Sequence, residues 1–503
     1  MTPRNLNHTL HPIDWVVIGL YLVVLLGVGW YYSRRTVTAE DYLLGGRRMK
    51  SWRVGLSLFA SLLSTISFLA WPGEMIRYGP LFMGGCIAYP FIILFVGWIL
   101  IPRIMELPVT SAYEILERRL GLGPRLLGAG FFLAMRLIWM SVILYATAEK
   151  ALIPMLEWDP KVSPYVCAAL GTVTVLYTSF GGLRAVVMTD VIQSIVLLSG
   201  AFLTLGIITY DLGGVGAWWP LQWMDHWPEP VFGYDPSARM SLVGMSIAVF
   251  TWYICTSGSD QMAVQRYLAT RNPRQARKSL TVSICSDATV MLLMGFVGLS
   301  LLSYFRLNPG LIPEGKTLVE SGDVLFTRFI VFGLPQGITG LVVAGLLSAA
   351  MSSLSSGLNS SCSVILTDFI DRFFPSEISE RDRIRRAITV SILVGVVVVT
   401  LSTAVGVVKG NLLEVTFKTV NLVTAPLAGL FFLAFFVPWA SSIGAVIAGV
   451  GSLGVVIAVN YWEFFTGNPG ISFIWALPLG LVSEMAIGMV ASLIFPKSRV
   501  PIL

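Results

Sequence analysis

Long apolar runs, each of about 20 residues, recur along the whole chain and are separated by short stretches rich in Gly, Pro and charge. A helix of that length matches the hydrocarbon thickness of a bilayer, so each run predicts a membrane-spanning helix. The pattern predicts about 13 spans. They begin near Ile13, Trp52, Leu81, Leu126, Tyr165, Val186, Ser241, Leu280, Ile338, Ala387, Leu413, Ile443 and Phe473.

The composition supports an all-α polytopic membrane protein without a large soluble domain. Of the 503 residues, 55% are hydrophobic and 12% are charged, whereas soluble domains carry about 25% charged residues. The polar first fifteen residues predict no cleavable signal peptide. The cysteines form no CxxC pair, which argues against disulfides and a transition-metal site. They lie in apolar runs, at Cys86, Cys167, Cys255, Cys285 and Cys362.

The distribution of basic residues predicts the orientation. Lys and Arg number 34 against 28 Asp and Glu, and about two thirds of them fall in one alternating set of loops. By the positive-inside rule, this set faces the cytoplasm, which places the N-terminus outside the plasma (inner) membrane and the C-terminus inside. We attribute the surplus to these loops and not to nucleic acid binding. The loop assigned after the seventh span contains Arg266, Arg271, Arg274, Arg277 and Lys278.

Two spans are unusually polar for helices that face only hydrocarbon. The second contains serines from Ser57 to Ser67 and ends at Pro72, and the ninth is dense in serine from Ser348 to Ser363. Close helix packing through small residues is one explanation, and a sodium site built from neutral oxygens is the other. A carboxylate inside the sixth span, Asp190, needs an ion or a partner such as Arg184.

Several segments resemble the signature of the sodium:solute symporter family, which includes sodium-coupled sugar, sialic acid, iodide, proline and monocarboxylate carriers. The first is the string Tyr177–Ala185 followed by Thr189–Gln193, and two further landmarks are Ser111–Gly121 and Ser259–Thr270. The resemblance implies a leucine-transporter-like core of two inverted five-helix repeats, with the second and seventh spans unwound at mid-membrane.

The same resemblance implies a division of the chain. Its parts are an N-terminal peripheral span and cytoplasmic loop (1–51), a first repeat (52–210), an extracellular cap loop (211–240), a second repeat (241–437) and two peripheral spans (438–503).

Matched position by position, the resemblance implies two sodium ions as coupling ions and no other cofactor. Sodium site one would comprise Ala60, Leu63, Ala349, Ser352 and Ser353. Sodium site two would comprise Asp190, Ser352, Ser355 and Ser356.

The solute region is predicted less sharply. Met262 and Asp260 stand where sugar carriers of the family have an aromatic gate and an Asn, and the surrounding segments resemble the branch that carries monocarboxylates, vitamins and iodide. Arg136 lies near mid-membrane, where it either faces an anionic solute or pairs with Asp260 or Asp287. Asp287 itself receives no role. The candidate solute residues are Ser61, Ser64, Ser67, Arg136, Trp139, Trp252, Asp260 and Met262, with ordinary packing as the alternative for the two tryptophans.

Other function classes fit the sequence less well. An enzyme would need acid–base residues at a water interface, but the three histidines lie outside the predicted spans and no HExxH, GxSxG or P-loop motif is present. A membrane sensor would carry a signalling domain, and a proton-coupled carrier has no need for the serine set. We therefore predict sodium-coupled symport of a small organic solute (a sugar, a sialic acid-like molecule or a monocarboxylate anion) into the cell by alternating access. The oligomeric state stays open.

Overall fold

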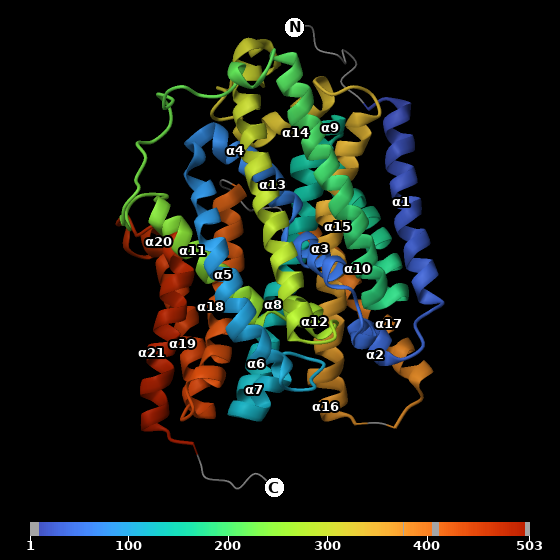
Figure 1. The fold of residues 1–503 in the computed structure, drawn as a ribbon, viewed down its shortest axis with the longest axis vertical. Helices are drawn as coiled ribbons and strands as arrows, with labels where there is room; N and C mark the ends of the chain where they lie inside the picture. Colours follow the sequence, from blue (N-terminus) through green and yellow to red (C-terminus); the bar gives the residue numbers. More distant parts are fainter. Residues whose placement is uncertain (1–9, 376, 405–411, 498–503) are drawn as a thin grey trace.

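The computed structural model describes residues 10–375, 377–404 and 412–497, which form a bundle of helices (Figure 1). The α-helices are α1 (Pro12–Ser33), α2 (Ala39–Leu44), α3 (Ser51–Leu62), α4 (Thr65–Tyr78), α5 (Tyr89–Phe95), α6 (Ile101–Met105), α7 (Tyr113–Leu120), α8 (Leu122–Ala146), α9 (Ile153–Leu156), α10 (Ser163–Asp211), α11 (Leu242–Ser259), α12 (Gln261–Leu268), α13 (Pro273–Leu307), α14 (Gly322–Phe332), α15 (Ile338–Val364), α16 (Asp371–Phe373), α17 (Glu380–Ala404), α18 (Leu412–Phe436), α19 (Ser442–Asn460), α20 (Trp462–Thr466) and α21 (Ala476–Ile494).

The number of membrane crossings agrees with the predicted pattern. Within the described residues, ten helical rods are long and apolar enough to span a membrane, and the bent pair α3–α4 makes an eleventh. The helical segment Pro160–Asp211 has 52 residues, enough for two crossings of the hydrocarbon layer, and it is divided at Gly182. It contains both the fifth and the sixth predicted spans, and α18 corresponds to the eleventh. The prediction of an all-helical polytopic fold is confirmed.

The division of the long rod falls at Gly182, in the segment that resembles the family signature. Gly182 has φ 60° and ψ −164°, a backbone conformation open to glycine alone. A Cβ atom there would lie 2.8 Å from the carbonyl oxygen of Tyr42. The Tyr42 hydroxyl in turn donates a hydrogen bond to the carbonyl of Ser179 at 2.7 Å. The signature glycines thus join α2 closely to the bend in α10.

Two spans are interrupted, as the resemblance implied. The axes of α3 and α4 meet at an angle of 67°, and α11 is separated from α12 at Asp260, whose ψ of 120° is not helical. Each break leaves backbone N–H and C=O groups without partners in their own helix. At two positions inside the bundle, backbone polar groups therefore need partners from other parts of the chain.

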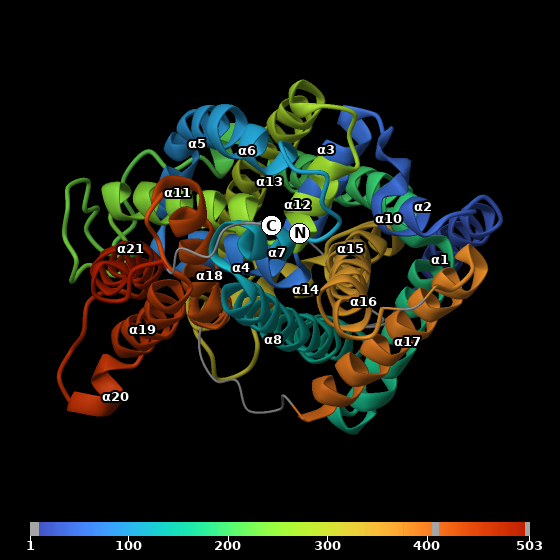
Figure 2. The ribbon, with the colours of Figure 1, turned by 90° about the horizontal axis from the view of Figure 1, so that it is seen from below.

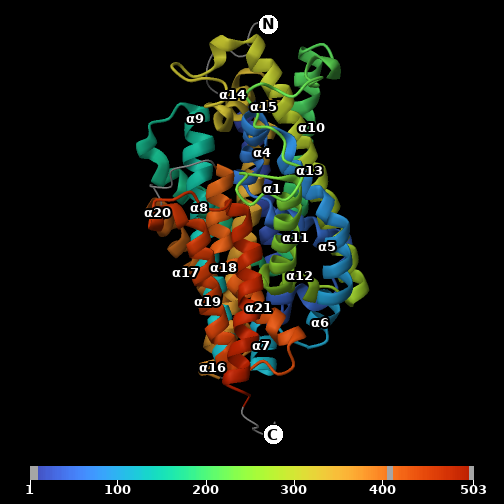
Figure 3. The ribbon, with the colours of Figure 1, turned by 90° about the vertical axis from the view of Figure 1, so that its left-hand side faces the viewer.

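The serine-rich helix α15 lies inside the bundle, where it packs against α3, α8, α10 and α17. Seen from below, α19, α20 and α21 lie at one edge of the molecule and α1, α2 and α17 at the other (Figure 2). Figure 3 shows α9 and α14 toward one end and α6, α7 and α16 toward the opposite end. We refer to the end with α6, α7 and α16 as the basic end, because most of the basic loops fall there.

The start of α15 is held by the first span. The buried carboxylate of Asp14 accepts hydrogen bonds from the backbone N–H groups of Gly337 (2.7 Å) and Gly340 (2.8 Å). These donors belong to the first turn of α15 and have no partner within that helix. A negative charge at a helix N-terminus is also favourable. Asp14 therefore fixes the position of the serine helix.

The predicted cap loop packs over the end of α4. The indole N–H of Trp227 donates to the carbonyl of Ile76 at 3.2 Å, and the His226 ring nitrogen Nε2 lies 2.9 Å from the same oxygen. Arg239, near the end of the loop, forms an ion pair with the buried Glu74. The loop thus satisfies a carbonyl at the C-terminus of α4.

Candidate cation and solute sites

The first candidate site forms where the break in α3–α4 meets α15. Leu63 and Ser64 are extended, with ψ values of 123° and 167°, so the last carbonyls of α3 point away from a helical partner. The hydroxyl of Ser352 donates to the carbonyl of Ala60 at 2.8 Å, and the hydroxyl of Ser353 donates to that of Leu63 at 3.0 Å. The two serines thereby join α15 to the broken span.

All five residues assigned to sodium site one are therefore brought together. Ser352 also contacts the carbonyl of Ala349 at 3.3 Å, and the exposed fraction of each of the five side chains is 4% or less. The oxygens are neutral, and a hydroxyl can rotate to offer a lone pair instead of its proton. A cluster of neutral oxygens with these properties suits a monovalent hard cation.

The second candidate site surrounds Asp190 on α10, which is fully buried. Its Oδ2 accepts a hydrogen bond from the Ser57 hydroxyl at 2.5 Å and lies 3.4 Å from that of Ser356. The Ser61 hydroxyl lies 2.6 Å from that of Ser356 and also approaches Asp190. The other carboxylate oxygen of Asp190, Oδ1, has no hydrogen-bond partner among the described residues. One carboxylate oxygen is thus free to ligate.

A buried arginine occupies the other side of Asp190. The guanidinium of Arg266 on α12 has no solvent exposure and lies 3.3 Å from Oδ2 of Asp190. It also donates to the Ser57 hydroxyl at 3.0 Å and to that of Ser356. The carboxylate is therefore neutralised by an internal cation. Arg184, the partner considered from the sequence, instead forms an ion pair with Asp41 at 2.6 Å.

The remaining members of sodium site two, Ser352 and Ser355, form hydrogen bonds to other groups. The Ser355 hydroxyl donates to the carbonyl of Ser352 at 3.0 Å, and the Ser352 hydroxyl points to site one. Of the four predicted residues, Asp190 and Ser356 are in direct contact, whereas Ser352 and Ser355 precede Ser356 on α15 by one turn and by one residue.

A cavity of about 140 Å³ lies beside site one. The predicted solute residues that line it come from five helices and the break after α11; they are Ser61, Ser67, Arg136, Trp139, Trp252, Asp260 and Met262. Ser64 does not line it; its side chain lies at the N-terminus of α4 and accepts from the Ser67 N–H. The other lining residues include Trp71, Phe82, Tyr89, Tyr253, Asp287, Asn421 and Thr424.

The charges that line this cavity are unevenly paired. Arg136 forms an ion pair with Asp260, which is the structural alternative considered from the sequence. Asp260 also accepts from the Met262 N–H at 2.8 Å and so caps α12. Asp287 on α13 accepts hydrogen bonds from the hydroxyls of Tyr89 and Tyr253, but it has no ion-pair partner among the described residues.

Comparison with known families agrees with this geometry. The model of the sodium:solute symporter family matches residues 42–451, most of the chain. The chain belongs to the sodium:solute symporter family. The resemblance noted in the sequence is thereby confirmed, and with it sodium-coupled symport of a small solute across a membrane.

Similar proteins within the family include sialic acid symporters and a monocarboxylate transporter. The chain is 30% identical over 502 residues to a sodium/sialic acid symporter of Proteus mirabilis, with 97% of this chain and 96% of that protein covered. It is 29% identical to a sodium/sialic acid symporter of Aliivibrio fischeri, covering 89% and 88%. It is 30% identical to the human sodium-coupled monocarboxylate transporter 1, covering 92% and 74%.

Solved structures confirm the fold. A Na⁺-coupled sialic acid symporter in a substrate-bound outward-open state superposes with a TM-score of 0.82 at 28% identity, covering 97% of this chain and all of the other. The nucleobase-cation-symport-1 transporter Mhp1 has a TM-score of 0.56 at 14% identity and shares the fold alone.

One assignment from the sequence was wrong for this symporter. Arg266 is not in a loop but in the buried helix α12. The nearby residues Arg271, Arg274 and Lys278 are indeed exposed. Because Arg266 is close to these exposed basic residues in the sequence, its burial could not be recognised from the sequence alone. Sequence reasoning also missed Ser57 as a contact of Asp190. The polar spacing of Ser57 and Ser61, one helical turn apart, was the signal that could have found it.

Proposed function

We propose that the chain carries a small organic solute into the cell together with two sodium ions, using Ala60, Leu63, Ala349, Ser352 and Ser353 as the first ion site. The observation that carries this assignment is the convergence of five neutral oxygen-bearing residues at the break of α3–α4. A sodium ion there would join the broken span to α15 more firmly than the present hydroxyl–carbonyl hydrogen bonds do. Transport, and not catalysis, is the activity that we assign.

Coupling follows from the position of the cavity beside this site. Ser61 and Leu63 line the cavity, and their carbonyls accept from the Ser353 hydroxyl. An ion that orders these residues also orders one wall of the solute site. Sodium binding therefore favours the conformer that accepts solute, which is the thermodynamic requirement for symport by alternating access.

We assign the second sodium ion to Oδ1 of Asp190 with Ser352, Ser355 and Ser356. Oδ1 of Asp190 is buried and has no hydrogen-bond partner among the described residues, which supports this site. The ion pair between Asp190 and Arg266 limits when an ion can bind there. Arg266 must withdraw from Asp190 for an ion to be held firmly, since both cations compete for one carboxylate. Each sodium contributes about 2.3 kcal/mol at 100 mV, so two would concentrate a neutral solute about a thousandfold.

The orientation that we propose has the N-terminus outside and the C-terminus in the cytoplasm. The basic end, with α6, α7 and α16, would then face the inner leaflet of the plasma membrane. The partners of the protein would be the solute, sodium and the lipid bilayer.

The cavity supports a particular kind of solute, one that bears an ammonium group. Arg136 is already paired with Asp260, so the charge left over is that of Asp287, which lines the cavity with the hydroxyls of Tyr89 and Tyr253 beside it. The further aromatic residues lining the cavity, among them Trp71, Trp139 and Trp252, are favourable neighbours for a cationic amine. The anionic solutes of the named relatives would instead meet an uncompensated negative charge.

A thermal-shift screen of the purified full-length protein tests both parts of this proposal. Four solute classes would be compared with and without sodium: sugars, sialic acids, short carboxylates, and small amines with their amino-acid counterparts. We expect stabilisation that requires sodium and an amine. Stabilisation by carboxylates without an amine would overturn the ammonium assignment and leave sodium coupling intact.

The variant Asp287→Asn further separates the ammonium assignment from the assignment of sodium coupling. It should weaken binding of the amine tenfold or more without changing stabilisation by sodium alone. Asn421→Ala, which changes a neutral residue lining the same cavity, serves as the matched control. Equal losses in the two variants would remove Asp287 from its special role.

A further inference from the structure

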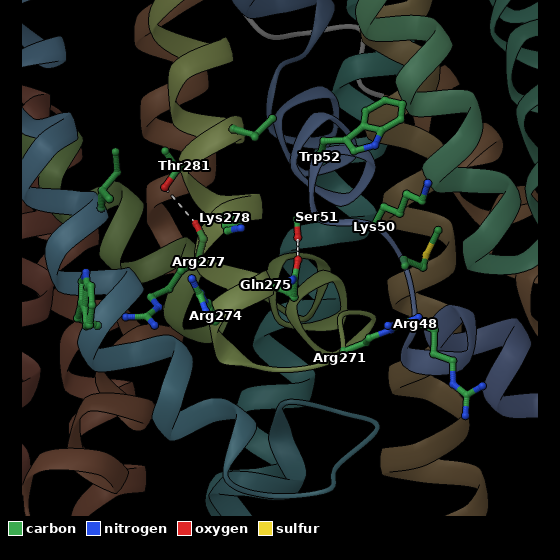
Figure 4. Close-up of a pocket in the computed structure, with 14 residues that line it drawn as sticks. Arg48, Lys50, Ser51, Trp52, Arg271, Arg274, Gln275, Arg277, Lys278 and Thr281 are labelled. Atoms are coloured by element: carbon green, nitrogen blue, oxygen red, sulfur yellow. Dashed lines mark hydrogen bonds between the residues drawn. The ribbon is translucent and has the colours of Figure 1, made fainter.

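A second, larger cavity opens at the basic end and plays no part in the sites above. It is a groove of about 960 Å³ between the start of α3, the segment α5–α6 and the start of α13 (Figure 4). The groove is lined by Arg48, Met49, Lys50, Ser51, Trp52, Ile93, Trp98, Arg271, Arg274, Gln275, Arg277, Lys278, Thr281 and Val282.

The groove is strongly basic. Six of its lining residues are Lys or Arg and none is acidic. Figure 4 shows Arg48 and Lys50 on one side, with Arg274, Arg277 and Lys278 on the other. No carboxylate pairs with any of the six in the part of the chain that the structure describes. The groove is therefore a concentration of uncompensated positive charge.

Several other arginines at the same end have carboxylate partners, unlike those of the groove. Arg47 pairs with Glu40 and Arg184 with Asp41. Further along the chain, ion pairs join Arg119 to Glu106, Arg125 to Glu117 and Asp368, Arg372 to Glu117, Arg383 to Glu380, Arg385 to Asp382 and Arg386 to Asp371. Solvation of loop charges alone does not account for a groove from which carboxylates are absent.

Part of the groove wall is apolar. Trp52 and Trp98 are 46% and 64% exposed, as tryptophans at a membrane–water interface commonly are. The guanidinium of Arg277 stacks over the ring of Trp98, with its carbon 3.7 Å from the ring centroid. Ile93 and Val282 continue the apolar surface. Positive charge beside exposed apolar surface is the pattern that matches an anionic amphiphile.

We propose that this groove binds the headgroup of an anionic phospholipid from the adjacent leaflet. Its phosphate would lie among the six cations, and its acyl chains would extend over Trp98 and Ile93 into the bilayer. Basic pockets between transmembrane helices on the cytoplasmic side are suited to such headgroups. A soluble phosphate would use the charges but would leave the apolar wall in water.

The position of the groove links this lipid to the moving parts of the transporter. Ser51 at the start of α3 hydrogen-bonds Gln275 on α13 across the groove. One turn on, a Cβ atom at Gly55 would lie 2.6 Å from the carbonyl of Ser279, so the two helices touch closely. A headgroup that neutralises the cations on both helices would relieve their repulsion and stabilise this contact. Because α3 ends at sodium site one, lipid composition would act on transport through α3.

The test uses the full-length protein in neutral-lipid nanodiscs, with phosphatidylglycerol added in steps. The groove variant combines Arg271→Gln, Arg274→Gln and Lys278→Gln, three exposed side chains. The control variant combines Arg381→Gln, Arg383→Gln and Arg385→Gln, which removes the same charge from exposed positions at the start of α17. We expect phosphatidylglycerol to raise the unfolding temperature of the wild type and the control, and to have less than half that effect on the groove variant.

Two further arms complete the experiment. Replacing Arg271, Arg274 and Arg277 by Lys keeps the charge and should keep the response to phosphatidylglycerol. Inorganic phosphate at matched concentration should not reproduce the stabilisation. The proposal is overturned by an equal response of groove and control variants, by equal stabilisation with phosphatidylcholine, or by a full effect of phosphate alone.

Discussion

Two groups of serines on the same helix meet different partners. Ser352 and Ser353 face the backbone carbonyls of the broken span, which are neutral. Ser356, one turn further along α15, faces Asp190 and Arg266, an ion pair with no exposure to solvent. The first site therefore contains oxygens without charge, whereas the second contains a charge that is already matched.

For the two proposed ion sites, this difference predicts how each would select sodium. Site one depends on the number and placement of oxygens, and no internal cation competes for them. At site two, a sodium ion and the guanidinium of Arg266 compete for one carboxylate. We therefore expect sodium to bind first and more tightly at site one, and the second ion to bind only when Arg266 moves.

Removing Arg266 should have the largest effect. Arg266→Met leaves Asp190 buried without its partner, and breaking such a pair costs about 3–5 kcal/mol of stability. Sodium should restore more stability to this variant than to the wild type, because it replaces the lost positive charge. The measurement is unfolding of the detergent-solubilised protein in sodium and in choline buffers.

The matched control for that prediction is the double variant with Asp190→Asn. Removing both charges should restore much of the stability and abolish the extra response to sodium. If sodium stabilises the single variant no more than the wild type, the competition between cations is refuted.

Loss of the second ion is the next largest effect. The double variant Arg266→Met with Asp190→Asn, in which neither buried charge is left without its partner, should lower the sodium Hill coefficient of uptake toward one and remove the contribution of one ion, about 2.3 kcal/mol at 100 mV, from solute accumulation. Some transport should remain, because site one is intact. Uptake by the wild type that is already hyperbolic in sodium would contradict two ions.

A smaller effect is expected from a single neutral ligand. Ser353→Ala removes one hydroxyl from site one, a loss of about 1 kcal/mol, which corresponds to a roughly fivefold higher sodium concentration for half-maximal uptake. Ser360→Ala is the control, since its hydroxyl bonds only to the backbone of its own helix. Equal sodium dependence in both variants would exclude the Ser353 side chain as a ligand.

The smallest effect is expected at Ser64, next to Leu63. Its hydroxyl lies at the N-terminus of α4, so Ser64→Ala should cost about 1 kcal/mol of stability or less and leave the half-maximal sodium concentration unchanged. Parallel unfolding and uptake measurements distinguish an effect on stability from an effect on sodium binding. A severalfold change in sodium dependence would place Ser64 among the ligands instead.

Much of the architecture was predictable because apolar length and membrane thickness are directly related. The spans begin close to the predicted residues, and the break between α3 and α4 falls within the serine-rich stretch. The set of oxygens at site one followed from resemblance to the family, since no spacing rule relates Ala60 to Ser352 across almost 300 residues of chain.

Arg266 shows why the remainder was not predictable. It lies only a few residues from exposed arginines, and nothing in its own segment marks it as buried. Its burial depends on Asp190 and Ser57, which come from distant parts of the chain and are brought together by tertiary packing. Likewise, the role that we propose for Asp287 rests on its place in the cavity beside the hydroxyls of Tyr89 and Tyr253, which tertiary packing brings together.

Asp14 has a consequence for protein engineering. Although the first span lies outside the two predicted repeats, its carboxylate holds the N-terminus of the helix that carries the serines proposed to bind sodium. A Cβ atom at Gly340 would lie only 2.6 Å from the Cα of Asp14, so the two backbones leave no room for an inserted tag or linker at this junction. Truncations, fusions and minimal versions of this carrier should therefore retain the chain from His11 onward.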